Sequence, residues 1–186
     1  MLFRSASPDQ SEVFFVSTSG NDDAAGTSLK TAWRTLGAAG RRAKPGQTIY
    51  VTAGEYHETL APVNSGTTEQ PIRFVRYGHD RVIIDGHQKL ALGIDLTDRA
   101  NVVVSGIVVR GQTQAAVRVD RAANVRLDQV TMLSAQQGLS GTSASALELR
   151  HCLIRGHHDA GLSLVKSSGV TLLGNLLDEN RGPALQ

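Results

Sequence analysis

The segment NVVVSGIVV, residues 101–109, decides the fold because similar segments follow it at a nearly constant spacing. It returns as NVRLDQVTM at 124–132, ALELRHCLI at 146–154 and GVTLLGNLL at 169–177, in steps of 23, 22 and 23 residues. A period of roughly 20 to 50 residues is typical of proteins built by stacking one small unit. The sequence therefore predicts a repeat protein.

A second column of similar segments runs beside the first with the same period. Its members are GIDL at 93–96, AVRV at 116–119, GLSG at 138–141, GLSL at 161–164 and ALQ at 184–186. The steps are 23, 22, 23 and 23 residues. Two independent columns that share one period make a chance match implausible.

Apolar residues alternate within each unit, which indicates strands with one buried face. The alternating positions of the first column are Val102 and Val104, Val125 and Leu127, Leu147 and Leu149, Val170 and Leu172. Those of the second column include Ile94 and Leu96, Val117 and Val119, Leu162 and Leu164. A third short run contains Ile107 and Val109, Val130 and Met132, Cys152 and Ile154. Each unit therefore holds three short strands, and Leu149 and Leu172 are predicted to share one core column.

Three strands in about 22 residues describe one coil of a parallel β-helix. Helical repeats would need a period near 3.6 and longer amphipathic stretches, and leucine-rich repeats carry one strand per unit. Successive coils would stack about 4.8 Å apart through parallel strand hydrogen bonds. The predicted fold class is thus all-β, a parallel β-helix. The family resemblance given in the next paragraph implies that this helix is right-handed.

The chain resembles the right-handed β-helices of the pectate-lyase-like superfamily. Its N-terminal third is similar to the opening of secreted bacterial β-helix proteins, including family 9 pectate lyases. The shared residues are Gly20 and Asp22, Gly26 and Thr27, Trp33 to Thr35, Pro45 and Gly46, Thr48 to Val51, Gly54 and Tyr56, Pro71 and Ile72, and Ile84 to Gly86. The resemblance spans most of 13–186, and it implies a secreted, periplasmic or cell-surface protein.

The N-terminal third is expected to close the stack. Residues 33–43 read as a short helix ended by KPGQ, and such a helix would cap the first coil. We expect residues 1–12 to be a disordered or artefactual N-terminus, and 13–186 to be one domain. Within it, 13–90 would hold the cap and first coils, and 91–186 the regular coils. Because the repeat stops at 184–186, in mid-coil, we expect the sequence to be a C-terminally truncated fragment of a protein that is monomeric when intact.

Composition excludes several classes of partner. The chain has 19 Lys and Arg residues against 17 Asp and Glu, without a basic run, so nucleic acid is not expected as a partner. Its apolar runs are too short to span a membrane. The single cysteine, Cys152, permits no disulfide within the chain and is expected to be buried. The first residues contain no apolar core of a signal peptide.

The turn HHDAG provides the first candidate substrate-binding residues, His157, His158 and Asp159. The resemblance implies a substrate groove made by this turn and by the outer face of the strand that follows it. On that face Asp95 and Arg118 are predicted to be neighbours that either pair with each other or contact an acidic sugar. The competing interpretation is a polar turn that simply faces water.

Lys166 is the last candidate, because β-helix lyases use a basic residue to take the C5 proton of a uronate. Calcium neutralises the adjacent carboxylate in that reaction. No acidic cluster stands near Lys166 in the sequence, so a solvated turn is the favoured interpretation and Ca²⁺ is expected only in the full-length protein. The loop GNDDAAG lacks calcium-site spacing. The histidines show no zinc-site pattern, and no metal site is predicted.

Two functions remain open. The first is a polysaccharide-active protein, most concretely a lyase for a uronate polymer such as pectate, with catalytic coils beyond residue 186. The second is a non-catalytic β-helix that binds glycan or builds a surface structure such as an adhesin or phage fibre. An aspartate cluster with a basic residue in later coils would favour the first. An anchor or trimerisation segment would favour the second.

Overall fold

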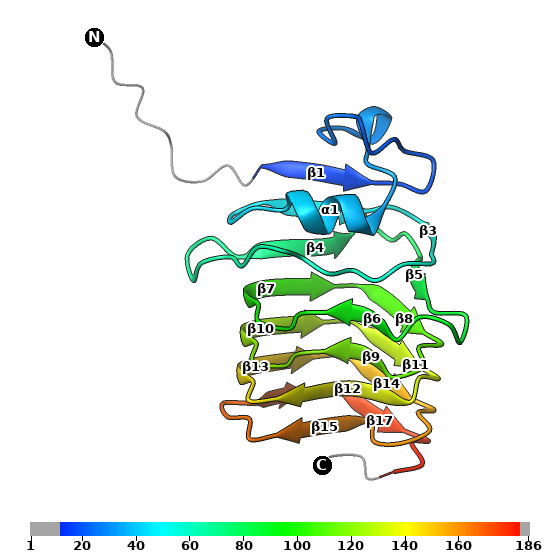
Figure 1. Cartoon of the computed structure of the whole chain (residues 1–186), viewed down its shortest axis with the longest axis vertical. Helices are drawn as coiled ribbons and strands as arrows, with labels where there is room; N and C mark the ends of the chain where they lie inside the picture. The colour runs from blue at the N-terminus through cyan, green and yellow to red at the C-terminus, as the bar shows by residue number, and fades with distance from the viewer. Residues whose placement is uncertain (1–11, 183–186) are drawn as a thin grey trace.

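The computed structural model describes residues 12–182 and shows a parallel β-helix (Figure 1). The chain winds in coils, and successive coils add strands to three parallel sheets that we call sheets A, B and C. The predicted fold class is thereby confirmed. The strand predicted at 184–186 and the features predicted for residues 1–11 lie outside the described residues.

Sheet A has seven strands and runs the whole length of the described stack. In spatial order its strands are β1 (Val13–Val16), β2 (Thr48–Val51), β4 (Ile72–Arg76), β7 (Ala100–Ser105), β10 (Ala123–Asp128), β13 (Ser145–Arg150) and β16 (Thr171–Leu173). Every pairing between them is parallel. Parallel ladders between coils satisfy the backbone groups that each short strand presents on its two edges.

Sheets B and C complete the coil. Sheet B contains β3 (Gly54–Tyr56), β5 (Val82–Asp85), β8 (Ile107–Arg110), β11 (Thr131–Leu133), β14 (Leu153–Arg155) and β17 (Leu176–Asp178). Sheet C contains β6 (Leu92–Asp95), β9 (Ala115–Arg118), β12 (Gln137–Thr142) and β15 (Leu162–Val165). A regular coil therefore passes through A, then B, then C.

The register of the strands confirms the predicted apolar columns. Leu127 pairs with Val104 on one side and with Leu149 on the other, and Leu149 pairs in turn with Leu172. Leu127 and Leu149 are fully buried, whereas Leu172 is 40% exposed because no described strand covers it. The core is thus a stack of inward side chains whose burial depends on a neighbour in the next coil.

A left-handed backbone recurs at four positions of the regular coil, and two of these positions are corners beside sheets A and C. The corner between sheets A and B is made by Gly106, Gln129, His151 and Gly174, and the corner that leaves sheet C by Asp98, Arg121, Ser143 and Lys166. All eight residues have φ between 51° and 74°. These left-handed residues recur at equivalent positions, so successive coils turn at the same places.

The N-terminal end differs in detail from the prediction. Helix α1 spans Leu36–Arg42 rather than 33–43, because Trp33 pairs with Val16 and Thr35 caps the helix through its side chain. Trp33 also stacks on Phe14, with ring centroids 4.9 Å apart. The 3₁₀ helix η1 (Leu29–Thr31) lies in the loop between β1 and α1. The closure of this end therefore consists of β1, this loop and α1 together (Figure 1).

Asp22 holds that closure in place. Its carboxylate accepts hydrogen bonds from the backbone N–H groups of Arg34 and Thr35, at 2.7 and 2.9 Å, and from the Thr35 hydroxyl at 2.7 Å. Partial burial acts to raise the pKa of Asp22, but these hydrogen bonds outweigh it and the pKa lies below its ordinary value. Asp22 therefore organises the loop before α1. None of the described helices is long and apolar enough to cross a membrane.

Candidate functional site

The outer face of sheet C presents one row of polar side chains. Asp95, Arg118, Ser140 and Ser163 occupy equivalent positions on β6, β9, β12 and β15. Adjacent strands stack about 4.8 Å apart, so the four positions extend over roughly 14 Å. Two charged side chains are followed in this row by two small hydroxyl side chains.

Asp95 and Arg118 lie side by side but do not pair with each other among the contacts of the described residues. Asp95 accepts hydrogen bonds from the backbone and the hydroxyl of Thr97, at 3.0 and 2.6 Å. Arg118 donates to the Gln114 side chain at 2.8 Å and lies 3.8 Å from the Asp120 carboxylate. The Arg118 side chain is about 30% exposed, so its guanidinium group remains accessible to an anion.

His157 of the HHDAG turn is fully buried, which the sequence did not reveal. Its Nδ1 accepts a hydrogen bond from Ala135 N–H at 3.2 Å, and its Nε2 lies 3.1 Å from the Met132 carbonyl oxygen. This fixes the tautomer with the proton on Nε2. Burial holds the pKa of His157 below its ordinary value. The ring ties its turn to the preceding coil and is inaccessible to a ligand in this arrangement.

Two other coils make equivalent backbone contacts with other side chains. Asn180, 23 residues after His157, accepts from the His157 N–H and donates to the Ile154 carbonyl. Gln112 is also fully buried and donates to the Ile84 carbonyl. A polar residue at this turn position thus satisfies backbone groups of the coil before it. The sequence holds a polar residue at the equivalent positions 112, 157 and 180, but Ala135 occupies this position in the coil between Gln112 and His157.

His158, Asp159 and Lys166 do not converge on one point. His158 is exposed, whereas Asp159 is half-buried and accepts a hydrogen bond from the Gln137 side chain at 3.1 Å. Lys166 is exposed at the opposite end of β15, about 13 Å away for a strand of this length. The assignment of these residues to substrate binding stays a prediction. The contacts join Gln137 to Asp159 at the turn end of sheet C, and Arg118 to Gln114.

A second surface lies on the outer side of sheet A. It is a hollow of about 370 Å³ between that sheet and the loop before β4. The residues around it are Thr68, Glu69, Pro71, Arg73, Val103, Asn124, Val125, Arg126 and Glu148. Arg126 is already paired with Glu148 at 2.5 Å, so part of the positive charge in this hollow is neutralised by the protein itself.

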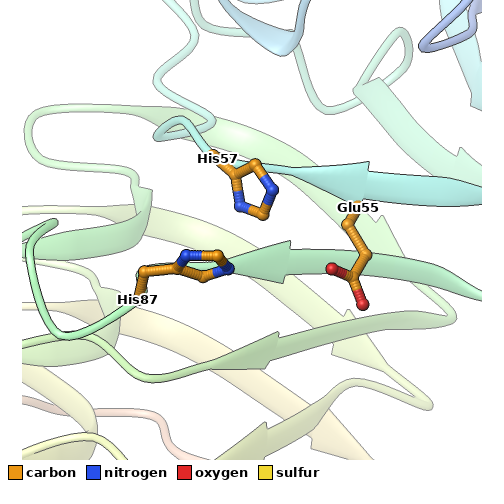
Figure 2. A group of neighbouring side chains, drawn as sticks. All are labelled: Glu55, His57 and His87. Atoms are coloured by element: carbon orange, nitrogen blue, oxygen red, sulfur yellow. The ribbon is translucent and has the colours of Figure 1, made fainter.

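A third cluster, Glu55, His57 and His87, was missed by the sequence analysis. Glu55 lies in β3, His57 directly after it, and His87 in the turn after β5 (Figure 2). All three are exposed, and one ligand atom from each lies within 4.8 Å of the others. The residues are up to 32 positions apart, and the register of two irregular coils was needed to bring them together.

Asp85 and Arg110 contact the residues of this cluster, Asp85 through His87 and Arg110 through Glu55. Asp85 accepts a hydrogen bond from His87 N–H at 2.8 Å and from Arg110 Nε at 2.6 Å. Burial acts to raise the pKa of Asp85, but these contacts outweigh it and hold the pKa below its ordinary value. Arg110 also reaches Glu55 Oε1 at 3.1 Å. The cluster therefore stands on a fixed ion-pair network.

Comparisons with known proteins agree with the fold. A family described as Pel9A-like, right-handed β-helix region, matches residues 14–168. The uncharacterised protein YwoF of Bacillus subtilis is 33% identical over 104 residues, which cover 53% of this chain and 22% of YwoF. Among solved structures, the GH136 lacto-N-biosidase of Eubacterium ramulus superposes with a TM-score of 0.74 at 13% identity, over 88% of this chain and 40% of that one.

The pectate lyase Pel9A superposes with a TM-score of 0.69 at 16% identity, over 88% of this chain and 46% of that enzyme. At such identities the structural matches establish the fold alone. The chain spans less than half the length of each of these three proteins.

Proposed function

Since the chain belongs to the Pel9A-like right-handed β-helix family, we propose that it binds an acidic polysaccharide along the outer face of sheet C. The polymer would be a chain of uronates such as pectate, and the protein would act outside the cytoplasm, where such polymers occur. Polysaccharide-active proteins share the fold, including an enzyme described as a rhamnogalacturonan lyase. This likeness supports the class of ligand and leaves the surface to be argued from the residues.

The observation that carries the proposal is the setting of Arg118. Its guanidinium group is held by the neutral Gln114 side chain and lies only loosely near Asp120. A guanidinium group donates two parallel hydrogen bonds to a carboxylate, so a uronate matches it in charge and in shape. Ser140 and Ser163 continue the row with small hydroxyl groups that leave space for further sugar rings.

Cleavage of the polymer would require more than this row. β-Elimination needs a base at the C5 proton and a cation that neutralises the uronate carboxylate. In the part of the chain that the structure describes, no cluster of three acidic or histidine ligands lies beside Lys166. We therefore propose that sheet C supplies binding, and that lyase activity is a property of the whole protein.

Binding can be tested with polygalacturonate by affinity electrophoresis and calorimetry. Arg118→Ala should weaken binding about tenfold or more, as expected for loss of a charge-assisted pair worth roughly 1.5 to 3 kcal/mol. Arg126→Ala, in the hollow of sheet A, is the matched control and should change affinity less than twofold. Fully methyl-esterified polymer should bind weakly, because its carboxylates are neutral.

The outcomes separate the alternatives. If Arg126→Ala weakens binding and Arg118→Ala does not, the hollow on sheet A is the binding surface and the proposal is wrong. If neither the polymer nor its ester binds, the acidic ligand is wrong. Tight binding without unsaturated products from the full-length protein would favour a non-catalytic glycan-binding or structural β-helix.

A further inference from the structure

We propose that Glu55, His57 and His87 form a binding site for a divalent transition-metal ion, Zn²⁺ in the first place. This site is independent of polysaccharide binding, because it lies on sheet B and the turn after β5 rather than on the outer face of sheet C. Figure 2 shows the Glu55 carboxylate and the two imidazole rings projecting into one space from neighbouring coils.

The parallel register of β3 and β5 creates the juxtaposition. Tyr56 pairs with Ile84, so His57 stands opposite Asp85 and His87 follows two residues later. The rings of His57 and His87 come within 4.2 Å of each other, centroid to centroid, with a tilt of 59°. The two rings are therefore close enough for one nitrogen of each to approach the same ion.

The distances fit a metal after a small adjustment. Ligand atoms bound at about 2.0 to 2.2 Å around a tetrahedral Zn²⁺ are roughly 3.4 Å apart. The three ligand atoms here lie within 4.8 Å of one another. Because all three side chains are exposed, changes in their outer torsions can close the remaining distance without displacing the core.

The second layer of contacts prepares the histidines as ligands. His57 Nδ1 lies 3.4 Å from the Asp85 carbonyl oxygen, and a proton placed there leaves Nε2 free to bind a metal. Asp85 holds the turn through His87 N–H at 2.8 Å, and its carboxylate lies 3.6 Å from His87 Nε2. A metal-binding histidine in proteins usually has such an oxygen partner on its other side.

The local charge favours a dication. Glu55 and Asp85 bring two negative charges, and Arg110 returns one positive charge through its contacts with both carboxylates. The Arg110 contact uses Glu55 Oε1, so Oε2 is the oxygen that a metal would take. The remaining net charge of about −1 attracts a divalent ion at short range.

The ligand set selects the kind of metal. Two imidazoles and one carboxylate suit zinc, copper or nickel, whereas Ca²⁺ and Mg²⁺ prefer sites made only of oxygen ligands. Three protein ligands leave a fourth position for water or for another molecule. Bound metal would join β3 to the turn after β5 and so stabilise the first coils of the stack.

The test uses the full chain without an affinity tag, titrated with ZnCl₂ by isothermal calorimetry at pH 7.5. We expect one Zn²⁺ per chain, and a rise in melting temperature that CaCl₂ does not reproduce. His57→Gln, His87→Gln and Glu55→Gln should each weaken Zn²⁺ binding about tenfold or more.

Matched controls are exposed histidines elsewhere, His79→Gln and His151→Gln, of which His151 lies 3.5 Å from Asp128. These variants should bind Zn²⁺ as the unchanged chain does. Nuclear magnetic resonance of the imidazole groups should show His57 and His87 shifting together on addition of Zn²⁺. The proposal is overturned if no Zn²⁺ binds, if Ca²⁺ stabilises equally, or if only a control variant loses binding.

Discussion

Replacement of Leu149 by alanine tests the column model of the core directly. Leu149 is fully buried and lies between Leu127 and Leu172 in the same column. The change removes three carbons, worth about 0.8 kcal/mol each in transfer, and leaves a cavity between two coils. We expect a loss of about 3 to 4 kcal/mol in the free energy of unfolding.

Leu172→Ala is the matched comparison because it is the same substitution one coil further along. Leu172 is 40% exposed, so it has less to lose, and we expect about 1 kcal/mol or less. Glu148→Ala adds an outward control, because its ion pairs with the partly exposed Arg126 and Arg150 lie at the surface, where such pairs are worth little.

The three variants are compared by chemical denaturation and calorimetry. For a chain of this length, 1 kcal/mol shifts the melting temperature by about 2 to 4 °C, so Leu149→Ala should melt roughly 6 to 16 °C lower. Leu172→Ala and Glu148→Ala should each shift it by no more than about 4 °C. Equal shifts for Leu149→Ala and Glu148→Ala would refute the inward register of Leu149.

Three further predictions concern pH dependence, thiol reactivity and lyase activity. The pKa of His157 is lower in the folded chain than in the unfolded chain, so the stability of the fold should fall as the pH drops below about 6.5. In thermal melts, this dependence of stability on pH should be smaller in His157→Asn and unchanged in His158→Gln. Burial raises the pKa of the Cys152 thiol, so the native chain should react slowly with a thiol reagent and the denatured chain rapidly; fast native labelling would contradict its burial. The 186-residue chain with polygalacturonate and Ca²⁺ should release no unsaturated product absorbing in the ultraviolet, because no acidic cluster stands beside Lys166 in the described residues; robust release would show that the base was misjudged.

The regular part of the fold could be predicted because each coil obeys one rule. Inward positions must be apolar in every coil, so Val104, Leu127 and Leu149 record the register in the sequence itself. The corners are recorded less clearly. A residue in the left-handed conformation is usually glycine or asparagine. Gln129, His151 and Lys166 also adopt this conformation, and their residue types do not predict it.

The candidate sites were harder to predict because polar side chains obey no such rule. His157 and His158 are adjacent and chemically identical, but one is buried against backbone groups and the other faces solvent. Only the comparison of equivalent turns distinguishes them, since Asn180 and Gln112 bind backbone groups in the same way as His157. The resemblance implied a groove at this turn, and the residue types alone did not separate the two histidines.

Departures from the period explain where the unpredicted surfaces lie. Along sheet B the steps are 28 residues from Tyr56 to Ile84, 25 to Val109, 23 to Met132 and 22 to Ile154. A coil of the stack has a nearly fixed circumference, so extra residues must leave it as loops.

The extra residues of the 28-residue step form the loop before β4, which lines the hollow on sheet A together with Arg73 and Arg126. The extra residues of the 25-residue step lengthen the turn after β5. Six residues separate Asp85 from Leu92, whereas four separate Arg110 from Ala115. His87 stands in that longer turn and reaches back toward His57 and Glu55. In a solenoid the repeated coils provide a rigid support, and the sequence that breaks the repeat is free to build a site. Shortening the turn after β5 by two residues should therefore remove Zn²⁺ binding while leaving the apolar columns intact.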